Sequence, residues 1–209
     1  MKPLTLYQSY MKLLIATHNP GKLKEIRAIF DIDGLELVGS REVPDIPQVI
    51  EDADTLQANA IKKALEPSRL MGWWTLADDS GLEVEALGGA PGVYSARYAG
   101  PEADYNANNR KLLDELDGET NRRAKFRCVL ALASPDGMVE TVSGTCEGVI
   151  SDKPRGVQGF GYDPVFIPDG HDQTFAELDP ETKNRISHRA RALDAARLKW
   201  TEMLREVAG

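Results

Sequence analysis

The chain has 209 residues, of which 42% are hydrophobic and 28% are charged. This length fits one large domain or two closely apposed lobes, and the composition is ordinary for a globular protein with a substantial core. The formal net charge of −8 disfavours nucleic acid and anionic membrane surfaces as partners, because both are usually bound through basic faces. A small phosphorylated ligand stays compatible with this charge, because it needs only a few local cations.

Cysteine usage and the lack of targeting signals predict a cytoplasmic protein. Cys128 and Cys146 lack CxxC spacing and lie among apolar or small residues, which favours free buried thiols over a disulfide between neighbouring strands. No run reaches the roughly 18 apolar residues of a membrane span, and residues 1–10 lack the pattern of a signal peptide. We therefore expect an N-terminal extension at residues 1–10 and a single domain at residues 11–209.

The first half of the chain alternates expected strands with expected helices. A short apolar run predicts a buried strand at Lys12–Ala16, and Thr17–Lys22 has the composition of a loop. Leu23, Ile26 and Phe30 lie on one helical face. Further along, we expect a strand at Leu35–Val38, a loop at Arg41–Asp54 and a helix at Thr55–Arg69.

The second half is richer in expected strands. Trp73–Ala77 predicts a third strand that stops at Asp78, and residues 135–137 predict the turn of a hairpin between Ala124–Ala133 and Met138–Ile150. Strands alternating with helices, followed by this hairpin, predict an α/β fold with a mixed sheet. The other expected elements are a glycine-rich loop at Leu87–Gly92, a helix at Ala103–Leu116, a loop at Ser151–Gly161, a short strand at Asp163–Ile167, a helix begun by Asp179 and Pro180, and a last helix capped by Ser187 with Leu193, Ala196, Trp200, Met203 or Leu204, and Val207 on one face.

The loop Thr17–Lys22 lies between an expected strand and an expected helix. A helix start offers unpaired backbone N–H groups and a partial positive charge, which suits a phosphate group. Lys22 adds a charge, and Thr17 and Asn19 add polar side chains. The loop is not a P-loop, because the GxxxxGK[ST] spacing is absent. A tight connection with a solvated lysine is the alternative interpretation.

Two groups of acids have residue types that bind divalent cations. Asp78 and Asp79 directly follow an apolar run, and Glu51, Asp52 and Asp54 lie in the loop before a helix. Mg²⁺ takes oxygen ligands and keeps several waters, so it could neutralise a triphosphate and position a water molecule there. An unligated carboxylate could act as general base. A simple turn and a solvated acidic loop are the alternatives, but two acids after a buried strand need a reason.

Two later segments suit a nucleotide. Gln158–Pro164 alternates glycine with aromatic residues, which allows close backbone approach beside a ring, as a base pocket needs. Lys183, His188 and Arg189 bring potential cations near helix ends, and arginine suits bidentate recognition of phosphate or carbonyl groups. Alternatively, the glycines close a hairpin and Ser187 is a helix cap with solvated basic neighbours. The three histidines lie too far apart to indicate a zinc motif.

Together, these segments resemble the inosine triphosphate pyrophosphatase family, also called XTP/dITP diphosphatases. The run from Ala77 to Gly100, ADDSGLEVEALGGAPGVYSARYAG, is the most specific part. The order and spacing of the segments agree from about Met11 to the last helix. The other matching segments are Ile15–Lys22, Asn59–Ala64, Gly159–Phe166, Ala176–Leu178, and Lys183 with Ile186–Arg189.

The resemblance implies a fold and an activity. The family's fold is a mixed, bent β-sheet with flanking helices that form two lobes around a central cleft, usually as a homodimer. Its activity is Mg²⁺-dependent hydrolysis between the α and β phosphates of ITP, dITP and XTP, whose non-standard purines have a 6-keto group. The products are a nucleoside monophosphate and pyrophosphate, and the reaction cleanses the nucleotide pool. Residues 11–209 are then expected to form a single nucleotide pyrophosphatase domain.

The resemblance also implies roles for individual residues. Asp79 would be the catalytic carboxylate and, together with Glu51, a Mg²⁺ ligand. Lys63 would face the triphosphate, Ser80 would contact the substrate, and Phe160 would stack on the base. The remaining expected substrate-binding residues are Thr17, His18, Asn19, Pro20, Gly21 and Lys22 for the phosphates, Gly161, Tyr162 and Asp163 for the nucleotide pocket, and Lys183, His188 and Arg189 for the nucleotide.

The chain departs from the family's pattern at two places. Glycine is usual at the position of His18, so either the bend of the first loop differs or an imidazole enters the site. A Glu-Thr-Gly signature is replaced by Glu51-Asp52-Ala53, which makes Glu51 the best aligned metal ligand and leaves Asp52 or Asp54 as substitutes.

Two rival functions differ from this activity in their products. A phosphatase acting from the same cleft would release orthophosphate instead of pyrophosphate. A nucleotide sensor without turnover would be stabilised by the ligand and would form no product at any Mg²⁺ concentration.

Overall fold

The computed structural model describes residues 11–44, 46, 48–101 and 104–208. The expected extension at residues 1–10 lies outside this part, as do Pro47 and Ala103. The strands are β1 (Met11–Ile15), β2 (Leu35–Gly39), β3 (Trp74–Val84), β4 (Arg123–Ala133), β5 (Val139–Ile150) and β6 (Phe166–Pro168). The helices are α1 (Pro20–Ile29), α2 (Leu56–Met71), α3 (Tyr105–Glu115), α4 (Pro180–Ile186) and α5 (His188–Ala208), with short 3-10 helices η1 (Ser40–Glu42), η2 (Glu85–Leu87) and η3 (Gly92–Arg97).

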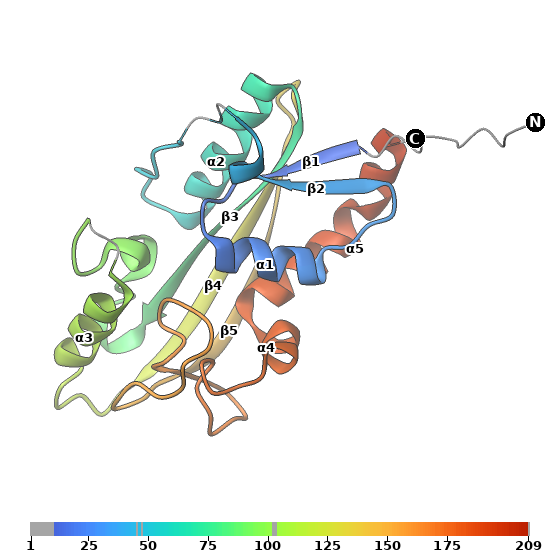
Figure 1. Cartoon of the computed structure of the whole chain (residues 1–209). Coiled ribbons are helices and arrows are strands. Elements are labelled where there is room, and N and C mark those ends of the chain that lie inside the picture. The colour runs from blue at the N-terminus through green and yellow to red at the C-terminus, as the bar shows by residue number, and fades with distance from the viewer. Residues whose placement is uncertain (1–10, 45, 47, 102–103, 209) are drawn as a thin grey trace, which may run out of the picture.

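The strands form one mixed sheet in the order β2-β1-β3-β4-β5-β6. β1 pairs in parallel with β2 and β3, whereas β3 to β6 pair antiparallel. Figure 1 shows that β3, β4 and β5 run well beyond the ends of β1 and β2. The expected α/β class, the mixed sheet and the hairpin are confirmed.

Alternate residues of the central strands face two different helix layers. In β4, Cys128 and Leu130 pack in one core cluster with α1 and α5, whereas Val129 and Ala131 pack in another with α2. This is the two-residue period of a β-strand, applied to a sheet with helices on both faces. Figure 1 shows α2 and α5 on opposite sides of β3 and β4. A residue of β3 is therefore assigned to one helix layer or the other by its position in the strand.

The far ends of β3, β4 and β5 have a core of their own. Leu82, Leu112, Phe126, Phe166 and Phe175 belong to this third buried cluster, which joins the sheet to α3 and β6. Figure 1 shows α3 at the end of the sheet away from β1 and β2. The molecule therefore has two lobes on one continuous sheet, as expected, and the segments between them are where a cleft is to be sought.

Local signals set the starts of three helices where they were expected. Thr55 Oγ1 accepts the backbone N–H of Ala58 at 3.1 Å at the start of α2. Asp179 caps α4 with proline next in sequence, and Ser187 Oγ accepts the N–H of Ala190 at 3.1 Å in the first turn of α5. Each polar oxygen satisfies a donor that the first helical turn leaves unpaired.

The expected end of the third strand is wrong. β3 does not stop at Asp78 but continues to Val84, because β4 pairs with it along this whole stretch, including Asp78↔Leu130 and Asp79↔Val129. The partner strand lies about fifty residues later in the chain, so no local signal announces it. The acids are therefore inside a strand, and each must be neutralised by whatever helix layer it faces.

Smaller differences concern element ends and side-chain burial. The helix expected at Ala103–Leu116 spans Tyr105–Glu115, and the short strand expected at Asp163–Ile167 is β6, which starts at Phe166. Val207 is 47% exposed, so the last turn of α5 extends past the core. Both cysteines are free and buried, as expected. Among the described residues, no helix is both long and apolar enough to span a membrane.

Candidate active site

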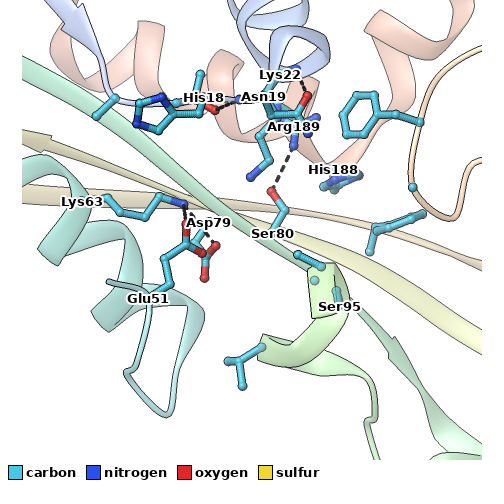
Figure 2. Close-up of a pocket in the computed structure, with 18 of the residues that line it drawn as sticks. His18, Asn19, Lys22, Glu51, Lys63, Asp79, Ser80, Ser95, His188 and Arg189 are labelled. Atoms are coloured by element: carbon cyan, nitrogen blue, oxygen red, sulfur yellow. Dashed lines mark hydrogen bonds and ion pairs between the residues drawn. The ribbon is translucent and has the colours of Figure 1, made fainter. Parts of the chain in front are cut away.

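The edge of β3 is open where β1 ends. The pairing of β1 with β3 stops at Ile15↔Leu76, whereas β4 continues beside β3 on its other edge. A cavity of about 300 Å³ lies along this open stretch, and Figure 2 shows its lining. The expected site residues that line it are Thr17, His18, Asn19, Lys22, Glu51, Lys63, Asp79, Ser80, Phe160, Gly161, Tyr162, Asp163, Lys183, His188 and Arg189, whereas Pro20 and Gly21 do not line it.

The loop before α1 uses its backbone amides internally. Asn19 Oδ1 accepts the N–H of Gly21 at 2.8 Å and that of Lys22 at 3.3 Å, and Thr17 Oγ1 accepts the N–H of Asn19 at 3.2 Å. The helix start is therefore already capped, and the amides expected to hold a phosphate are occupied. The loop offers the cavity side chains instead, above all the ammonium group of Lys22.

His18 stands at the cavity. Its side chain is exposed and belongs to the cavity lining, and Figure 2 shows the ring between the first loop and Lys63. Of the two consequences expected from a histidine at this position, the observed one is an imidazole at the site.

Glu51 and Asp79 share one cation. Lys63 Nζ, from α2, lies 3.1 Å from Glu51 Oε1 and 3.4 Å from Asp79 Oδ1 (Figure 2). Burial raises the pKa of Asp79, although the charges of Lys63 and Lys22 oppose this effect. Burial disfavours the ammonium of Lys63, but the nearby carboxylates outweigh it and raise the pKa of this lysine. Lys63 therefore stays charged between the two acids.

Of the three acids in the loop before α2, Glu51 reaches the cavity. Asp52 pairs with Lys62 at 2.8 Å, and neither Asp52 nor Asp54 belongs to the cavity lining. The main chain here is held by Arg97, whose Nη2 donates to the carbonyl oxygen of Glu51 at 3.1 Å. The main chain at Glu51 is thus tied to η3, which itself contacts β3.

Asp78 faces the opposite layer. Its Oδ2 lies 3.1 Å from Lys22 Nζ and 3.0 Å from Arg189 Nη2, and it accepts the hydroxyl of Ser80 at 3.2 Å. Burial alone would raise the pKa of Asp78, but the Lys22 and Arg189 charges hold it well below its usual range. Asp78 is therefore a buried anion that orients two cations and one hydroxyl toward the cavity.

Glu25 was missed by the sequence reasoning. It follows Lys22 by one helical turn, and its carboxylate pairs with Lys183 Nζ at 2.8 Å and with the guanidinium of Arg189. Despite burial, the charges of Arg189 and Lys183 lower the pKa of Glu25. A sequence signal existed, because an acid three residues after Lys22 lies on the same face of α1, but its partners are far away in the chain.

The ring of Phe160 is held at the cavity by a tight loop. Asp163 Oδ2 accepts the backbone N–H of Phe160 at 2.8 Å and the Lys183 ammonium at 2.7 Å. Gly159 has φ +76°, and a Cβ there would lie 2.0 Å from Asp163 Oδ2, so glycine is required. Lys183 Nζ and Arg189 Cζ lie 5.0 and 5.7 Å from the centre of the Phe160 ring. Cations thus gather on an aromatic surface beside open space.

Packing fixes the other aromatic groups. The Tyr162 hydroxyl donates to the carbonyl oxygen of Ser95 at 3.0 Å in a buried position, which fixes this side chain at the cavity wall. His188 stacks on Phe126 with ring centres 4.6 Å apart and an interplanar angle of 11°. Burial, followed by the charges of Arg189 and nearby lysines, lowers the pKa of His188 well below its usual value. The imidazole is therefore neutral at pH 7.

Two further cavity residues had no sequence signal. Phe126 comes from the middle of β4, and Tyr105 is the first residue of α3. The Tyr105 hydroxyl accepts a hydrogen bond from Asn19 Nδ2 at 3.2 Å, which links α3 to the loop before α1. From sequence alone, an aromatic residue in a strand or helix is interpreted as part of the hydrophobic core, because the segments that face it across the cleft are not known.

The donor set suits a hard divalent cation that is bound partly by its substrate. Among residues 11–44, 46, 48–101 and 104–208, no three His, Cys, Asp or Glu side chains gather as a metal site. Glu51 and Asp79 already converge on one cation. Mg²⁺ typically uses one or two carboxylates together with waters and substrate phosphates. The residues therefore fit a Mg²⁺ site that a triphosphate completes.

Comparisons with known proteins identify similar sequences and structures. A protein of Desulforamulus reducens named dITP/XTP pyrophosphatase is 53% identical over 188 residues, covering 89% of this chain and 94% of the relative. A protein of the same name from Exiguobacterium is 52% identical over 183 residues, covering 88% and 93%. The structure of the Staphylococcus aureus Ham1 protein is 40% identical, covers 94% of this chain and 99% of that one, and superimposes with a TM-score of 0.81.

The resemblance inferred from the segments between Ile15 and Arg189 is thus confirmed. The model of the Ham1 family matches residues 13–199, a span that starts within β1, includes β2 to β6 and contains every residue named above as lining the cavity. The chain belongs to the Ham1 family.

Proposed function

We propose that this protein hydrolyses ITP, dITP and XTP to the nucleoside monophosphate and pyrophosphate, and so removes non-standard purine nucleotides from the pool. The observation that carries the proposal is the convergence of Glu51 and Asp79 on one cation beside the Lys22 loop, in the cavity that Phe160 also lines. Support comes from the relatives named dITP/XTP pyrophosphatase, each of which matches more than nine tenths of its own length.

The cations of the cavity are suited to a triphosphate. Lys22, Lys63 and Lys183 reach it from α1, α2 and α4 and are paired with carboxylates. The carboxylates already orient the three ammonium groups toward the cavity. When a triphosphate binds, its phosphate oxygens would replace the carboxylates as partners of these lysines. Electrostatic stabilisation and positioning of this kind are the main sources of rate in phosphoryl transfer.

Glu51 and Asp79 would hold Mg²⁺, which when bound would neutralise phosphate charge and acidify a water molecule. Asp79 would orient the attacking water and take up its proton, because its carboxylate lies at the open edge of β3 and its pKa is raised by burial. The bond formed joins the water oxygen to the α phosphorus. The bond broken is the one between the α phosphorus and the oxygen that bridges the α and β phosphates. Pyrophosphate leaves with the electron pair of that bond.

Base selection would rest on Phe160, His188 and Arg189. The Phe160 ring offers a stacking surface, and Arg189 is a permanent donor. The neutral His188 can donate through one ring nitrogen. A 6-keto oxygen can accept a hydrogen bond from either of these two side chains. The 6-amino group of adenine is itself a donor, so it would face the N–H groups of Arg189 and His188 without forming a hydrogen bond. These buried groups would then be unpaired, which weakens the binding of ATP.

Residues 11–209 would act as one pyrophosphatase domain, as a homodimer in the cytoplasm, with no nucleic acid or membrane partner. The homodimer rests on the resemblance to the family. The compartment is supported by the two cysteines, which are free and buried, and the lack of a nucleic-acid partner by the net charge of −8.

The products of ITP turnover test the reaction type. We expect ³¹P NMR to show inosine monophosphate and pyrophosphate in equal amounts, with Mg²⁺ required. Inosine diphosphate with orthophosphate would instead identify a phosphatase. Binding of ITP without any product over a range of Mg²⁺ concentrations would identify a sensor.

A further inference from the structure

The Lys63 ammonium is shared by two carboxylates of the cavity. Its Nζ is 3.1 Å from a Glu51 oxygen and 3.4 Å from an Asp79 oxygen, and Figure 2 shows the ammonium joined by dashed lines to both carboxylates. The lysine is itself 8% exposed. It therefore provides the positive charge that a divalent cation would otherwise provide at this point.

The surrounding charges do not offer a substitute. The charge of Lys22 also acts on Asp79, but its ammonium is paired with Asp78 at 3.1 Å, and Lys62 pairs with Asp52 outside the cavity. Without Lys63, the carboxylates of Glu51 and Asp79 would lose the cation that they share, in a partly dehydrated place where like charges repel strongly.

We propose that Lys63 is a resident counter-cation of the metal site: it holds Glu51 and Asp79 together in the empty enzyme and must leave them before Mg²⁺ binds. The inference rests on the proposed function in that it takes these two acids as the metal ligands. Lys63 thereby has a role before substrate arrives, in addition to contact with the triphosphate.

The exchange is sterically reasonable. Mg²⁺ binds oxygen at about 2.0–2.1 Å, which is closer than the ammonium distances above, so the carboxylates must draw together as the lysine leaves. The Glu51 side chain is 38% exposed and can make that adjustment, whereas Asp79 is fixed in β3. The flexible four-carbon stem of lysine lets its ammonium move to another anion.

The exchange predicts an order of binding. Mg²⁺ alone has to displace the Lys63 ammonium, which then lacks another anionic partner, so Mg²⁺ alone binds weakly. A triphosphate offers the Lys63 ammonium a new anionic partner, so metal and nucleotide stabilise each other in the site. Lys63 would thus reserve the metal position for the metal–nucleotide complex.

Titration with Mn²⁺ alone, followed by electron paramagnetic resonance of free Mn²⁺, tests the exchange without turnover. Lys63→Met should bind one Mn²⁺ at least about tenfold more tightly than the wild type. Lys62→Met, which removes the same charge from the preceding residue of α2, should bind Mn²⁺ as the wild type does. Adding Glu51→Gln to Lys63→Met should abolish the gain, which assigns it to this site.

Equal or weaker Mn²⁺ binding by Lys63→Met would overturn the exchange, and so would an equal gain in Lys62→Met. Lys63→Gln provides a second variant of similar length and is expected to show the same gain if the methionine variant folds poorly. These outcomes are separate from the proposed function. Pyrophosphate release by the wild type with an unchanged Mn²⁺ affinity in both Lys63 variants would reject the exchange alone.

Discussion

Asp78 and Asp79 are neighbours in β3, and their carboxylates serve opposite sides of the sheet. Asp78 is paired with Lys22 and Arg189 from α1 and α5, whereas Asp79 is paired with Lys63 from α2. The alternation of side chains along a strand is sufficient to separate them. The first has the contacts of a structural anion, and the second lines the cavity beside Glu51. Exchanging either carboxylate for an amide should therefore have different consequences.

Asp78→Asn should destabilise the fold. The change leaves Lys22 and Arg189 buried near a neutral amide, and removing one partner of a buried ion pair typically costs about 3–5 kcal/mol. Urea unfolding at pH 7 measures this loss of unfolding free energy. Asp169→Asn is the matched control, because it removes an ion pair to Arg123 that is about half exposed and should cost about 1 kcal/mol or less. Equal effects of the two changes would contradict the assigned role of Asp78.

Asp79→Asn should abolish activity and spare the fold. We expect kcat for ITP to fall by roughly 10²–10⁴, the usual contribution of a positioned acid–base group. Burial raises the pKa of Asp79, so the ionised form costs stability in the folded state, and that cost grows as pH rises through the raised pKa. The amide variant should accordingly unfold at the same or higher urea concentration at pH 7. Full pyrophosphate release by this variant would remove Asp79 from the mechanism.

The acid limb of kcat/KM should lie above the range of an ordinary aspartate. The reaction needs ionised Asp79, so activity is lost as pH falls through its pKa. Because burial raises that pKa in the metal-free enzyme, the loss should begin above about 3.9, the value of a free aspartate. Values of kcat/KM for ITP supplied as its Mg²⁺ complex, without Mg²⁺ in large excess, would measure it between pH 4 and 8, provided that the fold is checked at each pH. An acid limb at or below the ordinary value would be inconsistent with a buried catalytic carboxylate.

Phe160→Ala should weaken binding of the base more than the chemical step. Loss of a stacking ring costs about 1–3 kcal/mol per base, so KM for ITP should rise by roughly tenfold or more, with a smaller change in kcat. Val157→Ala is a control in the same loop, since that side chain is 99% exposed. If Phe160→Ala kept the wild-type KM, the base would have to bind elsewhere.

The fold was largely predictable because its signals are local. Asp179 and Ser187 begin helices where the capping pattern places them, and the apolar period marks most strands. The extent of β3 was not predictable, since its continuation through Asp78 depends on β4, far along the chain. The same distance hid Glu25, whose partners Lys183 and Arg189 are more than 150 residues away.

The candidate site was recognised by resemblance more than by physical pattern. Helix-start logic predicted free amides at Thr17–Lys22, but the side chain of Asn19 accepts those of Gly21 and Lys22. The sequence around Lys22 and Lys63 does not indicate which acid each lysine pairs with. Lys22 pairs with Asp78 and Lys63 with Asp79 because α1 and α2 pack on opposite faces of β3. Three-dimensional contacts, therefore, are what distinguish the two aspartates.

Selectivity among nucleotides tests the central claim most directly. Pyrophosphate release should be measured for ITP, dITP, XTP, GTP and ATP, with and without Mg²⁺, and compared as kcat/KM. We predict Mg²⁺-dependent release that is fastest for ITP, dITP or XTP and much slower for ATP. Comparable turnover of ATP, or release of orthophosphate in place of pyrophosphate, would contradict it.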